Sequence, residues 1–101
     1  MSRSIALATL AAAFAAASFS AHAQENPRNL AAACAVCHGT DGKAVTKDVI
    51  PLAGLPREHI ATQMRAFRDG TRPATVMHQI AKGYTDAQID AMAAWFASQK
   101  R

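Results

Sequence analysis

Apolar residues are distributed along the chain in two different ways. Residues 5–17 are apolar or small with the single exception of Thr9, whereas from residue 27 onwards apolar positions recur at intervals of three and four. The second spacing is typical of helices that bury one face. No stretch alternates between apolar and polar positions for the length of a strand. The sequence therefore predicts an all-α domain preceded by a separate apolar segment.

The first helix of that domain is expected to run over residues 27–38. Asn26 suits the N-cap, and Pro27 suits the first helical position because the N–H that proline lacks would have no partner there. Gly39 would end the helix. Four residues at positions i, i+4, i+7 and i+8 would share one of its faces, namely Leu30, Cys34, Cys37 and His38.

A long loop and two more helices are expected next. Residues 40–56 are rich in glycine and proline and are interpreted as irregular. A helix over residues 57–69 would stop at Gly70, and a short helix over residues 75–82 would stop at Gly83. The apolar face of the longer helix would carry Ile60, Met64 and Phe67.

The last helix has the clearest start, because Thr85 and Gln88 form the pattern of a capping box. Lys100 and Arg101 are expected at its end, where cations suit the helix dipole. Its buried face would carry Ile89, Met92, Ala93 and Phe96, with Trp95 beside them.

The segment before the domain has the features of a signal peptide. Arg3 precedes the apolar run, and Ala21-His22-Ala23 has the small-x-small pattern of a cleavage site. The run is shorter than the ~20 residues that span a bilayer. We therefore expect residues 1–23 to be removed and residues 24–101 to form a periplasmic domain without a transmembrane segment.

Charge and cysteine content narrow the functional classes. The net charge is +4, and loss of Arg3 would leave +3, without a basic run that would indicate nucleic-acid binding. A mild basic bias instead suits an acidic docking partner, with Arg72 and Lys82 as expected contacts. A chain this short usually needs a disulfide, metal or cofactor for stability. Because both cysteines fall within four residues, a disulfide between distant segments is not expected.

The segment from Cys34 to His38 carries the main chemical signal. Its pattern, C-x-x-C-H, is the attachment signature of c-type haem. Residues three apart on a helix face the same side, so both thiols could bond one edge of the porphyrin while His38 offers a nitrogen to the iron. A thioredoxin-like site would need a strand before the motif, and a structural zinc site would need about four ligands. The sequence therefore predicts one covalent haem c.

The second axial ligand decides between two functions. An occupied position would make an electron carrier, whereas an open one would suggest a haem sensor or enzyme. The possible ligands are Met64, Met77, His78 and Met92. Met64 and Met92 fall on apolar stripes and are expected in the core. Met77 is favoured because it shares a helical face with Ile80 and Ala81, which leaves His78 on a solvated face.

These residues resemble those of a small bacterial class I cytochrome c. The resemblance covers nearly all of residues 24–101. Its motifs are the Cys-x-x-Cys-His-Gly start, the segments 50–55 and 63–72, and the Ala-x-Trp-Phe helix at the end. Segment 72–84 is similar to the haem subunit of flavocytochrome c sulfide dehydrogenases. The resemblance implies the class I cytochrome c fold, with three main helices and a short one around one covalent haem.

The resemblance also implies roles for individual residues. Cys34 and Cys37 would form the thioether bonds, and His38 and Met77 would be the axial ligands. Pro51 would offer its carbonyl oxygen to the other ring nitrogen of His38. Trp95 or Phe96 would pack on the first helix near residues 31–33.

The resemblance implies a function as well. The protein would carry single electrons and would not itself be an enzyme. It would be either a free shuttle or a haem subunit that accepts electrons from a sulfide-oxidising flavoprotein.

Overall fold

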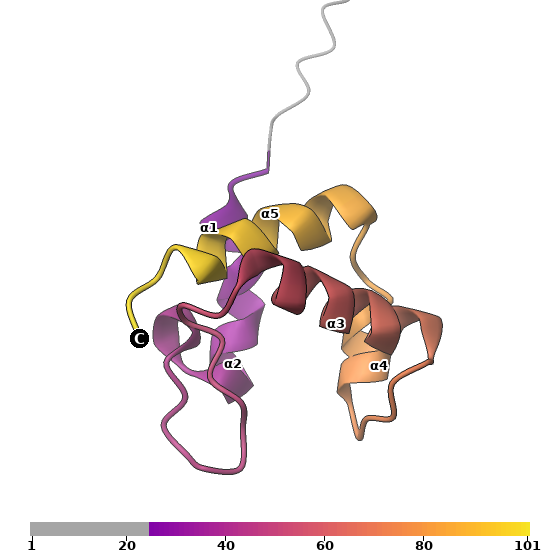
Figure 1. Cartoon of the computed structure of the whole chain (residues 1–101), viewed down its shortest axis with the longest axis horizontal. Coiled ribbons are helices and arrows are strands. Elements are labelled where there is room, and N and C mark those ends of the chain that lie inside the picture. The colour runs from indigo at the N-terminus through magenta and orange to yellow at the C-terminus, as the bar shows by residue number, and fades with distance from the viewer. Residues whose placement is uncertain (1–24) are drawn as a thin grey trace, which may run out of the picture.

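The computed structural model describes residues 25–101, and all secondary structure in this part of the chain is helical (Figure 1). The expected all-α architecture is therefore confirmed for these residues. The signal peptide expected at residues 1–23 lies outside the described residues and stays a prediction.

The first expected helix begins as predicted but is divided into three pieces. These are α1 (Pro27–Ala31), the 3-10 turn η1 (Ala32–Cys34) and α2 (Ala35–His38). The Asn26 side chain accepts a hydrogen bond of 3.0 Å from the Arg28 N–H. The expectation of one continuous α-helix is wrong, because a 3-10 turn lies between α1 and α2. Residues three apart lie on similar sides of an α-helix and of a 3-10 helix, so the apolar pattern of a sequence does not distinguish the two.

Helix α3 (Arg57–Asp69) has the expected bounds. It ends because Gly70, with φ of 79°, adopts the left-handed conformation that closes helices. Helix α4 (Met77–Ala81) is shorter than expected, since it lacks the first two residues and the last one of segment 75–82. The second short turn, η2 (Thr40–Gly42), lies in the expected loop.

Helix α5 (Asp86–Ala97) begins with the predicted capping box, in which Thr85 and Gln88 exchange side-chain to backbone hydrogen bonds. It ends at Ala97, so Lys100 and Arg101 lie beyond its last turn, which carries no basic residue. The expectation that they compensate the helix dipole is wrong, because this effect falls off within one turn.

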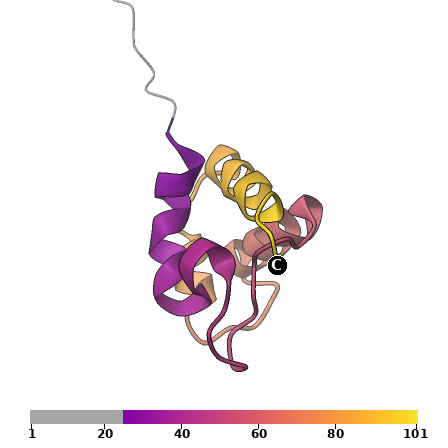
Figure 2. The same cartoon turned by 90° about the vertical axis from the view of Figure 1, so that its left-hand side faces the viewer.

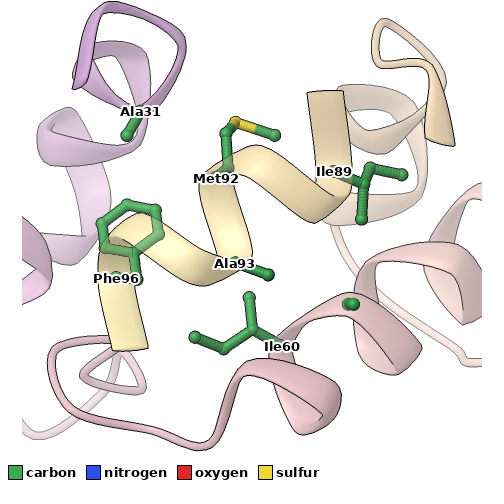
Figure 3. Close-up of a cluster of buried hydrophobic side chains, with 7 residues drawn as sticks. Ala31, Ile60, Ile89, Met92, Ala93 and Phe96 are labelled. Carbon is green, nitrogen blue, oxygen red and sulfur yellow. The ribbon is translucent and has the colours of Figure 1, made fainter. Parts of the chain in front are cut away.

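Helices α1 and α3 pack against α5, and α4 packs against α3 (Figures 1 and 2). Phe96 lies beside Ala31 of α1, as expected (Figure 3). Trp95 packs at the edge of this core, with its ring 5.0 Å from that of Phe96. Five of the nine buried hydrophobic residues are alanines. The protein core is therefore thin for three packed helices.

Ion pairs connect α3 to α5 at the surface. Asp86 accepts hydrogen bonds from Arg68 at 2.7 Å and from Arg65 at 3.3 Å, and Asp90 accepts one from Arg65 at 2.6 Å. Arg68 also donates to the Tyr84 carbonyl oxygen at 3.4 Å. These contacts hold the link between α4 and α5 next to the end of α3.

Candidate functional site

A cavity of about 830 Å³ lies among α2, the segment that precedes α3, α3 itself and α4. This volume is typical of a cofactor site, for which the range is about 300–1,000 Å³. Its inner lining is apolar and includes Leu52, Leu55, Ile60, Met64, Phe67 and Phe96. The protein core is thin, and the cavity beside it is lined by apolar side chains. A flat apolar group bound in the cavity would therefore complete the packing of the core.

The cysteine motif forms one wall of the cavity. Cys34, Cys37 and His38 all line it; Cys34 is half-buried and Cys37 is exposed. The chain leaves this wall at Gly39, whose φ is 82°. A Cβ atom at Gly39 would overlap the carbonyl oxygen of Lys43. The turn directly after His38 therefore requires glycine.

The ring of His38 is held in a fixed orientation. Its Nδ1 atom donates a hydrogen bond of 2.7 Å to the carbonyl oxygen of Ile50. Because the Ile50 oxygen can only accept, the proton is on Nδ1, and Nε2 keeps a lone pair for a metal.

The acceptor for His38 was expected to be Pro51, and this expectation is wrong by one residue. A residue before proline is restricted to extended backbone. In extended backbone successive carbonyl groups point in opposite directions. Only one of the two carbonyls at residues 50 and 51 can therefore face His38, and it is that of Ile50.

Helix α4 contributes Met77 and Ile80 to the cavity, and Met64 and Met92 also line it. In Figure 1, α2 and α4 lie on the two sides below α3. The structure thus brings Cys34, Cys37, His38 and Met77 to one cavity. Three methionines line it, so the assignment of Met77 as a ligand stays a prediction.

His78 does not line the cavity. Its Nδ1 atom is buried and has no hydrogen-bond partner among residues 25–101. The expectation of a solvated His78 is therefore wrong. One side of α4 carries Met77 and faces the cavity. Because α4 also packs along α3, protein covers a further part of its surface.

A comparison with known families identifies the fold. Residues 24–100 match the family model of cytochrome c. The chain belongs to the cytochrome c family. Members of this family carry covalently attached haem c, and the single Cys34–His38 motif corresponds to one haem per chain.

Similar cytochromes occur in several bacteria. The chain is 41% identical to a thiosulfate dehydrogenase electron acceptor of Thiomonas intermedia, over 99% of this chain and 45% of that protein. It is 43% identical to the cytochrome subunit of sulfide dehydrogenase of Chlorobaculum tepidum, over 68% of this chain and 62% of that subunit. It is 34% identical to cytochrome c-554(548) of Halomonas halodenitrificans, over 66% of this chain and 84% of that protein. The chain thus spans less than two thirds of the first two relatives.

The cavity of this cytochrome fits haem c. It combines two thiols, an imidazole with an available Nε2, methionine sulfurs and a wide apolar surface. Burial raises the pKa of the Cys34 thiol, and the nearby Cys37 adds to this effect. Burial likewise raises the pKa of Tyr84, which also lines the cavity. In the described part of the chain, no helix is long and apolar enough to cross a membrane.

Some polar residues of the cavity were not found from the sequence. His59 and Gln63 line it from α3, and Asp48 and Thr75 line it from loops. His59 and Gln63 are four residues apart, and Gln63 is four residues before Phe67 of the predicted stripe. These three residues therefore lie along one side of the helix, which is the signal that could have revealed the two polar ones. Arg72 and Lys82 were both expected as contacts of a docking partner; Arg72 is half-buried and lines the cavity, and Lys82 is exposed and does not line it.

Proposed function

We propose that this cytochrome carries single electrons. In this proposal Cys34 and Cys37 would hold the haem through thioether bonds, and His38 and Met77 would supply the protein ligands of its iron. The observation that carries the proposal is that His38, with its Nε2 available, and Met77 come from separate helices to line one apolar cavity. The bound haem supplies the change between ferrous and ferric iron, and the protein sets its potential and its exposure.

Ligation by histidine and methionine has two consequences. It raises the reduction potential relative to other ligand sets. It also leaves no iron position open to a substrate, so electrons leave and enter through the haem edge. The chain is accordingly not an enzyme in itself.

An electrochemical titration combined with carbon monoxide tests this function. We expect a reversible one-electron transition and a reduced protein that binds carbon monoxide slowly at neutral pH. Rapid binding by the unmodified protein would favour the alternative, a haem sensor or enzyme with an open coordination position.

The electron donor is proposed to be an enzyme that oxidises reduced sulfur compounds. The similarity to a sulfide dehydrogenase cytochrome subunit favours a sulfide-oxidising flavoprotein. The similarity to a thiosulfate dehydrogenase electron acceptor favours a second candidate donor. Reduction of the holo-cytochrome should be followed with each donor enzyme and its substrate in turn. Reduction by neither enzyme would contradict the proposal.

The site of action is proposed to be the periplasm. The basis is the signal-peptide pattern of residues 1–23, and c-type haem is attached after export. Fractionation of cells that express the full chain tests this, with the haem-containing protein expected in the periplasmic fraction. Haem-containing protein confined to the cytoplasm would contradict it.

A further inference from the structure

Arg72 is held at the cavity by contacts that leave most of its guanidinium donors unused. Its Nη1 atom donates to Oε1 of Gln63 at 2.5 Å, and its Cζ atom lies 4.6 Å from the centre of the Phe67 ring. Its backbone N–H donates to the Ala66 carbonyl oxygen at 3.2 Å. Arg72 is thus fixed to α3 by its backbone N–H and by its guanidinium, at the wall of the cavity.

The partners of Arg72 differ from those of Arg65 and Arg68, the two half-buried arginines of α3. Arg65 and Arg68 are both paired with aspartates. Arg72 forms no ion pair with a carboxylate among residues 25–101, and it is the only lysine or arginine there that lines the cavity. The partners of the half-buried Arg72 guanidinium are a neutral amide and an aromatic ring. The guanidinium therefore keeps free N–H donors, and their planar arrangement matches a carboxylate.

Haem brings two carboxylates with it, as the propionate groups on one edge of the porphyrin. An ionised carboxylate at the wall of an apolar cavity is stable only with a charged or hydrogen-bonding partner. Asp48 also lines the cavity but is exposed, so water and salt screen its repulsion.

We propose that Arg72 binds a haem propionate and that Gln63 positions the guanidinium for this contact. The inference rests on the proposed function, because it requires the haem to occupy this cavity. A fixed positive charge beside the haem also favours the ferrous state, in which the iron carries less positive charge. Arg72 therefore raises the reduction potential.

Three variants of the holo-cytochrome test this inference. Arg72→Gln removes the charge, Arg72→Lys keeps the charge without the planar fork, and Gln63→Leu removes the positioning amide. Arg57→Gln is the matched control, since Arg57 is an exposed arginine of α3, the helix that precedes Arg72, and it does not line the cavity. The measurements are the propionate bending modes in resonance Raman spectra and the reduction potential.

We expect Arg72→Gln to shift a propionate bending mode and to lower the potential, while Arg57→Gln changes neither. Arg72→Lys should shift the mode but retain more of the potential, and Gln63→Leu should shift the mode in the same direction as Arg72→Gln. Haem-loaded Arg72→Gln protein with unchanged propionate modes would overturn the inference alone. A wild-type protein without covalent haem would overturn the proposed function and the inference together.

Discussion

The imidazole of His38 and the carbonyl group of Ile50 are twelve residues apart in the chain and are joined by a hydrogen bond of 2.7 Å. The loop between them consists largely of exposed residues. This hydrogen bond ties the end of the loop to the cysteine motif. A histidine ligand that donates its second ring N–H in this way has a fixed orientation and a raised basicity.

Relaxing the backbone at Ile50 should loosen His38. Pro51→Ala removes the restriction that proline places on the preceding residue, so the Ile50 carbonyl is less firmly oriented. We expect the His38 Nδ1 proton to exchange faster with solvent, as measured by NMR on the reduced holo-protein. Pro73→Ala is the control, because it removes a loop proline that is remote in sequence from Ile50. Equal exchange rates in both variants would contradict the prediction.

The sequence predicts features that depend on neighbouring residues. The bounds of α3 follow from an apolar stripe that ends at Gly70, and the start of α5 follows from the capping box at Thr85. The motif at Cys34–His38 is equally local, and it predicts the cofactor because the spacing of the thiols and the imidazole is itself the chemical requirement.

Features that depend on contacts between separate segments of the chain were not predicted. Whether Ile50 or Pro51 faces His38 depends on the direction of one peptide group in a loop. The burial of the His78 Nδ1 atom depends on how α4 lies against α3. The pairing of Arg72 with Gln63 depends on the chain folding back after Gly70, and no local pattern encodes that contact.

Maturation should leave a single mass. We expect the mass of residues 24–101 plus one haem, stable in acid and in organic solvent, because two thioether bonds are covalent. Cys34→Ala and Cys37→Ala should each retain at most one such bond and give a much lower yield of haem protein. Intact-protein mass spectrometry measures both. Haem that extracts into organic solvent from the wild-type protein would contradict covalent attachment.

The haem-free chain should be largely unfolded. A domain of this size buries only about 60% of the surface of its unfolded chain. Here five of the nine buried hydrophobic residues are alanines, each of which contributes little apolar area. We expect the double variant Cys34→Ala with Cys37→Ala to lose most of its helical circular dichroism in the absence of haem. Helicity equal to that of the holo-protein would show that the protein core suffices.

The pH dependence of stability should involve Asp86. Hydrogen bonds from Arg68 and then Arg65 lower the pKa of this carboxyl. A lowered pKa in the folded state contributes stability above the ordinary aspartate value of about 3.9, and the contribution is lost as the pH falls through the lower folded pKa. Asp86→Asn should therefore lower the melting temperature at pH 7, and the difference from wild type should shrink below about pH 4.

Glu58→Gln is the control for Asp86→Asn. Both residues lie in the first turn of a helix, where an acidic side chain interacts favourably with the helix dipole. Glu58, however, has no ion pair in the described part of the chain. We expect the larger loss of melting temperature for Asp86→Asn. Equal losses would mean that the arginine contacts add nothing to the dipole.

The sixth ligand is tested by comparing two adjacent residues. Met77 lines the cavity, whereas His78 does not, and neighbours on a helix diverge by about 100°. Met77→Ala should abolish the methionine–iron charge-transfer band and open the reduced iron to carbon monoxide. It should also lower the potential by on the order of hundreds of millivolts, within the ~0.8 V span that axial ligands control. His78→Ala should leave all three properties nearly unchanged.

The other methionines of the cavity make the comparison stricter. Met92 is 3% exposed and belongs to the core, and Met64 packs against that core, so both have a structural role apart from the iron. Met64→Leu and Met92→Leu preserve apolar volume and should keep the charge-transfer band. If the band is lost in either of these variants and kept in Met77→Ala, the ligand is misassigned but the iron still has a thioether. If only His78→Ala opens the iron, ligation is by two histidines, and the electron carrier then works at a lower potential.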